Sequence, residues 1–138
     1  MHLDPHDTRA TQDLAILRAT HAHALLVGPP VAVDAAIAAL ESDLRRPVVA
    51  WTPTDTPEPP LLSSGTLIVR DLAALETEQQ LWLLDWMNRT SRAHRRVQII
   101  STCGRHVWTL VERGVFLTPL YYRLGAVCVD LTDTSADA

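Results

Sequence analysis

The sequence GTLIVRDLAALETEQQLWLLDWM, at residues 65–87, joins a short apolar run to a longer amphipathic pattern. The run TLIVR at 66–70 is apolar without alternation, as in a strand that is covered on both faces of its sheet. The pattern at 76–92 has helical spacing and places Leu83 and Met87 on one core-facing stripe. A buried strand that leads into an amphipathic helix is the building unit of an α/β fold.

The same unit recurs on both sides of this segment. Apolar runs predict four further strands, at residues 24–28, 47–52, 96–102 and 126–131. Helical patterns predict four further helices, at residues 8–20, 31–44, 105–113 and 118–124. Five short strands that alternate with helices through right-handed crossovers form a three-layer α/β sandwich with a mostly parallel sheet. This fold class alone does not define a function.

Length and composition indicate a single folded domain. The chain has 138 residues, 47% of them hydrophobic and 20% charged, which fits one globular domain and excludes a disordered chain. We expect a flexible leader at 1–7, a core domain at 8–131 and a tail at 132–138. Four prolines between residues 53 and 60 predict an extended loop at 53–65.

Charge and hydropathy argue against several classes of partner. The net charge is −4 and no long basic run is present, so nucleic acid is not expected as a direct partner, although a local basic patch stays open. No stretch approaches the roughly 18 uninterrupted apolar residues of a membrane helix. The N-terminus lacks an apolar signal core, so no membrane partner and a cytoplasmic location are expected.

The cysteines and histidines do not form a recognisable metal motif. Cys103 and Cys128 are too few for a disulfide framework and lack zinc-site spacing, so two buried, reduced thiols are expected. His21 and His23 have the spacing for weak chelation, but no cysteine or acidic cluster supports them. The sequence therefore predicts no metal site.

Three segments carry distinctive motifs in a fixed order. GVFLTPLYYRLGAVCVDL, at 114–131, contains Leu-Tyr-Tyr-Arg-Leu before an apolar strand; residues 65–87 begin with Gly-Thr-Leu; and VQIISTCGR occupies 97–105. Together they resemble the AAA+ domain of the bacterial enhancer-binding activators of sigma-54 RNA polymerase. Residues 25–40 more loosely resemble the phosphate loop and helix of that family. The resemblance spans roughly residues 10–131.

The resemblance implies a P-loop NTPase-like sheet with strand order 5-1-4-3-2. It also implies that this chain contains neither the family's helical lid nor its DNA-binding domain. The apolar loop with which family members touch sigma-54 would fall between the second and third strands. This chain has only TPTDTPEPPLLSSG there, at 52–65, so direct remodelling of sigma-54 is not expected.

The phosphate loop of active members reads Gly-x-x-x-x-Gly-Lys-Ser/Thr. Its glycines let backbone amides surround the phosphates, its lysine neutralises charge and its hydroxyl holds Mg²⁺. Counted from Gly28, the last three positions become Val33, Asp34 and Ala35. An aspartate there would repel phosphate, and the two prolines after Gly28 remove two backbone donors.

The remaining catalytic motifs implied by the resemblance are also replaced. The Asp-Glu pair that supports Mg²⁺ and orients water aligns with Arg70 and Asp71, the sensor asparagine with Gly104 and the trans-acting arginine with Leu117. The resemblance thus implies a degenerate nucleotide site at Gly28, Asp34, Arg70 and Asp71. That site would bind ATP or ADP weakly at most, without metal, and would not hydrolyse ATP.

Aromatic residues suggest where a partner would bind. Trp82 and Trp86 form a second stripe on the helix at 76–92, which fits either closure of a small core or a protein interface. Family members assemble as rings, so the resemblance implies a protein partner or self-association. The candidate interface residues are Trp82, Trp86, Tyr121, Tyr122 and Arg123. Arg123 also fits a structural role within the last helix.

These patterns lead to one main functional hypothesis and two alternatives. The main hypothesis is a non-catalytic regulatory or interaction module that acts in transcription regulation by binding protein partners. The first alternative is an ATP-binding switch that works without hydrolysis. The second is a signalling or structural domain unrelated to transcription.

Overall fold

The computed structural model describes residues 5–60 and 62–132. Its centre is a five-stranded sheet in the order β2-β3-β4-β1-β5, in which every neighbouring pair is parallel. The strands are β1 (Ala24–Val27), β2 (Val48–Trp51), β3 (Gly65–Val69), β4 (Val97–Cys103) and β5 (Val127–Asp130). Read from the other edge, this is the order 5-1-4-3-2, so the predicted fold class is confirmed.

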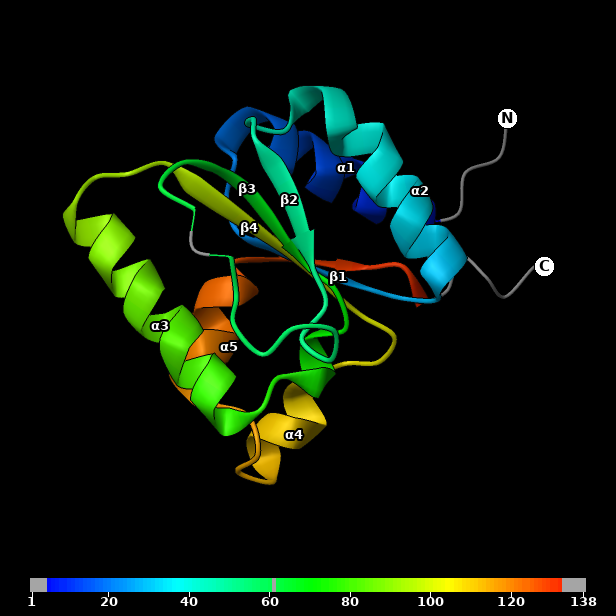
Figure 1. Ribbon diagram of the computed structural model, residues 1–138. Coiled ribbons are helices and arrows are strands. Elements are labelled where there is room, and N and C mark those ends of the chain that lie inside the picture. The colour runs from blue at the N-terminus through cyan, green and yellow to red at the C-terminus, as the bar shows by residue number, and fades with distance from the viewer. Residues whose placement is uncertain (1–4, 61, 133–138) are drawn as a thin grey trace.

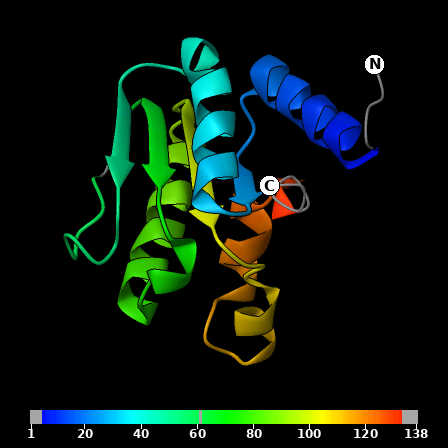
Figure 2. The ribbon, with the colours of Figure 1, turned by 90° about the vertical axis from the view of Figure 1, so that its right-hand side faces the viewer.

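Helices cover both faces of the sheet (Figures 1 and 2). One face carries α1 (Pro5–Thr20) and α2 (Pro30–Leu40), and the other carries α3 (Thr77–Arg92), α4 (Trp108–Glu112) and α5 (Thr118–Leu124). Two 3₁₀ turns, η1 (Glu41–Asp43) and η2 (Leu72–Ala74), complete the connections. No helix in the described residues is long and apolar enough to cross a membrane.

Alternate residues of each central strand point into two separate cores. On the α1–α2 side, Leu26, Ile68 and Ile100 pack against Leu17 and Leu40. On the α3–α5 side lie Leu25, Leu67, Ile99, Leu83 and Leu124. Because both faces are buried, apolar residues occur on both faces of each central strand, which is the pattern that made the strands recognisable in the sequence. Thr66 in β3 and Gln98, Ser101 and Thr102 in β4 are buried polar exceptions.

The first helix begins earlier than predicted. It starts at Pro5 rather than residue 8, because proline has a backbone angle suited to the first helical turn. Residues 5–7 of the predicted leader are therefore helical, while residues 1–4 and 133–138 lie outside the described residues. The expectation of two buried thiols is wrong for Cys128, which is exposed, because β5 is an edge strand.

The proline-rich loop between β2 and β3 is anchored by side chains of its neighbours. The Trp51 indole donates to the carbonyl and the hydroxyl of Thr56, both at 3.0 Å. The Gln79 amide donates to the carbonyls of Pro53 (3.2 Å) and Pro57 (3.1 Å). These bonds hold the loop against the start of α3.

Candidate functional site

The four predicted nucleotide-site residues meet at the carboxyl edge of the sheet. Gly28, Asp34, Arg70 and Asp71 line one cavity of about 240 Å³, together with Thr102 and Gly104 among others. The carboxyl ends of β1, β3 and β4 meet there because the strands are parallel and adjacent. This is the edge at which open α/β sheets bind ligands. Thr102 could not be recognised from the sequence as a residue of this site. Its hydroxyl accepts the amide of Asp71, a contact that forms only when β3 and β4 pair.

The connection from β1 to α2 is too short to form a phosphate cradle. β1 ends at Val27 and α2 begins at Pro30. The amide of Val33 donates to the carbonyl of Pro29 at 3.0 Å, so the position of the second family glycine is already inside the helix. Since proline has no N–H, Val31 and Ala32 supply the first-turn amides that remain. Two amides from one turn do not surround a phosphate.

Gly28 has a packing role at this turn. A Cβ atom at this residue would lie 2.9 Å from the Cβ of Leu131, closer than real Cβ contacts. The amide of Leu131 also donates to Val27 O at 2.7 Å, which draws the end of β5 over the turn. The glycine therefore allows the close approach of two backbone segments, whatever the site binds.

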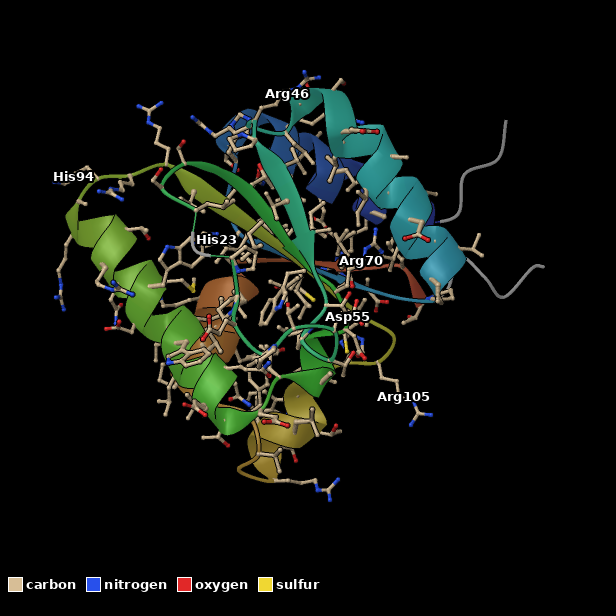
Figure 3. The ribbon with its side chains drawn as sticks, viewed as in Figure 1. His23, Arg46, Asp55, Arg70, His94 and Arg105 are labelled. Carbon is tan, nitrogen blue, oxygen red and sulfur yellow. The ribbon has the colours of Figure 1, made fainter. Side chains whose placement is uncertain are left out.

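Asp34 and Arg70 form an ion pair across the cavity. Arg70 Nη1 lies 2.8 Å from Asp34 Oδ1, with the side chains 40% and 59% exposed. Figure 3 places Arg70 near the carboxyl ends of the strands, opposite Arg46 at the other edge. The two residues that the resemblance aligns with the family lysine and with a metal-supporting acid thus neutralise each other's charge.

Asp71 adds a second negative charge beside this pair. Its backbone is left-handed, with φ of 58°, and its amide donates to Thr102 Oγ1 at 3.2 Å. Aspartate tolerates this conformation better than most residues. No ion pair joins its carboxylate to any residue within 5–60 or 62–132. Two carboxylates against one guanidinium leave the cavity unfavourable for a phosphate anion.

The family model for the sigma-54 interaction domain matches residues 11–134. The chain belongs to the sigma-54 interaction domain family. The resemblance inferred from the sequence is therefore confirmed. No curated protein sequence matches the chain.

Solved structures of low sequence identity share the fold of this sigma-54 interaction domain. NtrX from Brucella abortus in complex with ADP is 17% identical, with a TM-score of 0.72 over 96% of this chain and 36% of that chain. The P-loop NTPase domain of the Sigma-54 transport activator from E. coli is 17% identical, with a TM-score of 0.63 over 96% of both chains. The chain spans little more than a third of the NtrX chains.

The two tryptophans of α3 have different environments. Trp86 is 4% exposed, and its indole donates to Leu62 O at 3.2 Å. It therefore belongs to the core, and the prediction that it is an exposed interface residue is wrong. Helix packing against β3 and the proline-rich loop explains this burial. Trp82 is 38% exposed and lies over a cavity of about 410 Å³ that Glu58 and Pro59 also line.

The other candidate interface residues gather around an aromatic cluster. Tyr121 and Tyr122 lie with ring centroids 5.4 Å apart, and Trp108 from α4 lies 5.5 Å from Tyr121. Tyr122 is 61% exposed, so this cluster presents apolar surface to solvent. Trp108 could not be recognised in the sequence as part of this cluster, because α4 packs on α5 only in the folded chain. Arg123 donates a hydrogen bond to Asn88 Oδ1 and so links α5 to α3.

The two histidines before β1 are held separately. His21 Nε2 lies 3.0 Å from the carbonyl of Asp43, whereas His23 Nδ1 accepts the amide of Ile99 at 3.0 Å. Burial and then the nearby Arg123 guanidinium lower the pKa of His23 to about 4. The His23 ring is therefore a neutral structural acceptor between β1 and β4. No group of three or more His, Cys, Asp or Glu side chains suited to a metal occurs in the described residues.

Proposed function

We propose that this domain is a non-hydrolysing regulatory module of cytoplasmic transcription control that acts by binding protein partners. The observation that carries the proposal is the Asp34–Arg70 ion pair at 2.8 Å, because it occupies the place where active family members need a free lysine and a metal-supporting acid. The two-residue turn before α2 supports it, since the turn offers few amides to a phosphate. The family assignment supports a role in transcription regulation.

Phosphate release from Mg-ATP tests the absence of hydrolysis. We expect no release above a protein-free blank, because none of the groups that line the cavity supplies a metal-bound, water-orienting acid pair. Asp71→Asn removes the one unpaired carboxylate of the cavity, and Glu112→Gln on α4 is an exposed control of equal charge change. Release well above the blank that disappears in Asp71→Asn and persists in Glu112→Gln would falsify the proposal.

Binding of a protein partner needs a separate test. The exposed aromatic residues Trp82, Trp108 and Tyr122 give two apolar surfaces, one on α3 and one where α4 meets α5. Aromatic residues are enriched in protein interfaces. We expect size-exclusion chromatography with light scattering to show either self-association or a complex with a catalytically intact sigma-54 interaction domain. A clean monomer that does not bind the intact domain argues against the proposal.

Tyr122→Ser and Trp82→Ser show which of the two aromatic surfaces binds the partner. Both side chains are exposed, so each substitution should leave the fold intact while it weakens whichever complex uses that surface. Glu78→Gln, exposed in the first turn of α3, is the matched surface control. Loss of the complex in the control as well would mean that neither aromatic surface is specific.

A nucleotide-responsive switch without hydrolysis is the second candidate function. It is favoured by the cavity of about 240 Å³ beside the first turn of α2, where Arg70 supplies a cation that is 40% exposed. NtrX, which shares the fold, has been solved with ADP and with ATP. Calorimetry with ATP and ADP, with and without Mg²⁺, separates the two candidates. Micromolar binding that Arg70→Gln abolishes favours the switch, and no heat at millimolar nucleotide favours the first proposal.

A further inference from the structure

The arginines of this chain are unevenly distributed. The sequence contains no lysine, and its 12 basic residues are all arginines. Five of them lie at or near the amino edge of the sheet, opposite the cavity that contains Arg70. Arg45 and Arg46 precede β2, Arg95 and Arg96 precede β4, and Arg92 ends α3. An acidic chain thus has one strongly basic edge.

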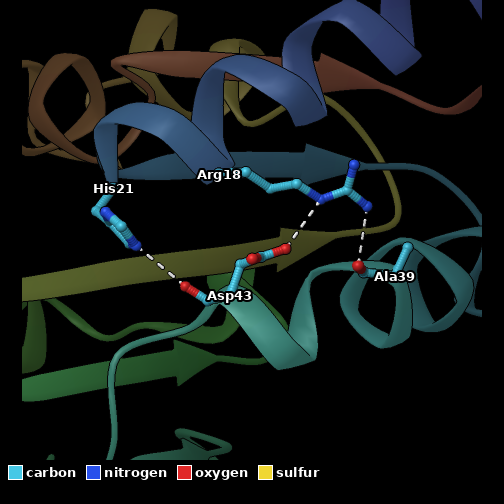
Figure 4. Close-up of polar contacts among 4 residues, drawn as sticks. All are labelled: Arg18, His21, Ala39 and Asp43. Carbon is cyan, nitrogen blue, oxygen red and sulfur yellow. Dashed lines mark hydrogen bonds and ion pairs between the residues drawn. The ribbon is translucent and has the colours of Figure 1, made fainter.

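These five arginines have no ion pair in the described part of the chain, whereas other arginines do. The acid closest to them in sequence, Asp43, is already held by α1. Arg18 Nε lies 3.2 Å from Asp43 Oδ2, and Arg18 Nη2 donates to Ala39 O at 2.9 Å (Figure 4). His21 contacts the Asp43 carbonyl in the same cluster. The charge of the amino edge is therefore not neutralised by Asp43.

The backbone holds the two arginine-bearing loops on either side of the first residues of β3. Thr66 donates from its amide to Pro47 O at 2.9 Å and from its hydroxyl to Arg45 O at 2.8 Å. On the other side, the amide of Gly65 donates to Arg96 O at 3.3 Å. Gly65 has φ of 109°, and a Cβ there would lie 2.3 Å from Pro47 O. The loops are therefore fixed in place before any ligand binds.

A cavity of about 330 Å³ opens between these loops. Arg45, Arg95 and Arg96 line it together with Thr20, His21 and Gln98. Gln98 is 2% exposed and donates from Nε2 to Ala22 O at 2.9 Å. Its Oε1 has no hydrogen-bond partner among residues 5–60 and 62–132. The cavity is thus lined by three arginines and by a buried glutamine with an unpaired acceptor.

We propose that this cavity at the amino edge binds a small phosphate-bearing ligand. Guanidinium groups present paired N–H donors that match phosphate oxygens, and three arginines line one hollow of limited size. This cavity lies at the opposite end of the strands from the predicted nucleotide site and does not depend on the proposed function.

Pyrophosphate titration followed by amide chemical shifts tests the site. We expect shifts at residues 20–21, 45–46 and 95–98, and saturation that weakens with salt. Arg95→Gln/Arg96→Gln should weaken binding by about tenfold or more, since it removes charge-assisted hydrogen bonds. Arg105→Gln/Arg113→Gln removes the same charge from exposed residues elsewhere and should change binding by less than about twofold. Equal losses in both double variants, or no saturation in the wild type, overturn the proposal.

Two further ligands identify the source of the phosphate. ADP that binds more tightly than pyrophosphate, and that needs Arg95 and Arg96 but not Arg70, supports an organic phosphate ester at the amino edge. Binding of ADP and pyrophosphate that needs Arg70 alone assigns both to the other edge and overturns the proposal. If a DNA duplex binds far more tightly than either ligand, with a steep salt dependence, the amino edge is a nucleic-acid-binding surface and the small-ligand proposal is overturned.

Discussion

Acidification should destabilise this domain through His23. The pKa of His23 is lowered from 6.5 to about 4 in the folded chain, mainly by burial and further by Arg123. Between these values the unfolded chain binds a proton that the folded chain does not. The unfolding free energy is therefore unaffected by His23 above pH 6.5. It falls as the pH drops from 6.5 toward 4, and below pH 4 His23 changes it no further. A separation of about 2.5 pKa units corresponds to roughly 3 kcal/mol of unfolding free energy at the acid end.

The hydrogen bond of His23 also predicts that protonation destabilises the folded chain. His23 Nδ1 accepts the amide of Ile99 at 3.0 Å, and a protonated ring has no acceptor to offer. Protonation would leave that buried strand amide unpaired and would place a second cation near Arg123. The same change therefore costs a hydrogen bond and adds charge repulsion at the junction of β1 and β4.

Urea unfolding, followed by the tryptophan fluorescence of the chain, to which the buried Trp51 and Trp86 contribute, measures the effect at pH values from 7.5 to 4.0. His23→Asn keeps a side-chain acceptor but cannot titrate, so its unfolding free energy should depend less steeply on pH. The wild-type curve should fall relative to this variant by roughly 3 kcal/mol across the range. His94→Asn, at an exposed residue with φ of 55°, removes a histidine without burial and should keep the wild-type slope. Identical slopes in wild type and His23→Asn would refute the reasoning.

Three further predictions follow from the packing and the site. Gly28→Ala places a Cβ 2.9 Å from Leu131 and should lower the unfolding free energy by about 1–3 kcal/mol in urea titrations; an unchanged value contradicts a packing role for the glycine. Gln80→Leu should cost about 3 kcal/mol by the same method, because the buried Gln80 amide bonds to Leu75 O, Val115 O and the amide of Leu117. Wild-type stability in this variant would mean that those groups find other partners. Asp34→Asn should change stability by less than about 1 kcal/mol, and less still at high salt, since the pair with Arg70 is largely exposed; a larger loss would show that the ion pair supports the fold.

The amino-acid sequence was sufficient to predict the layered sheet and the family. Each central strand is covered on both faces, so its hydrophobic residues do not alternate with polar ones and the strand can be recognised locally. Because the strands are parallel, residues that follow them must gather at one edge. The prediction that Gly28, Asp34, Arg70 and Asp71 share one site needed only this rule and the resemblance, and the structure brings all four to one cavity.

Local patterns could not separate the two tryptophans of α3. Trp82 and Trp86 lie one helical turn apart, and their periodicity alone fits burial or exposure equally. The proline-rich loop decides between them, because Leu62 O accepts the Trp86 indole while Trp82 lies at the rim of a cavity. That loop is anchored by Gln79 and Trp51 from elements on either side of it in sequence.

The sequence by itself determined the strands, most of each helix and the family, and it predicts the replacement of the family's catalytic residues. These features depend on nearest-neighbour spacing and on residue identity at motif positions. Only the tertiary structure decided the contact of Asp34 with Arg70, the environment of His23 and the basic amino edge. Arg45 and Arg95 are about fifty residues apart in the chain and come together because β3 inserts between β2 and β4. The burial and the charge of this edge depend on segments that are far apart in the sequence, so no local sequence pattern predicts them.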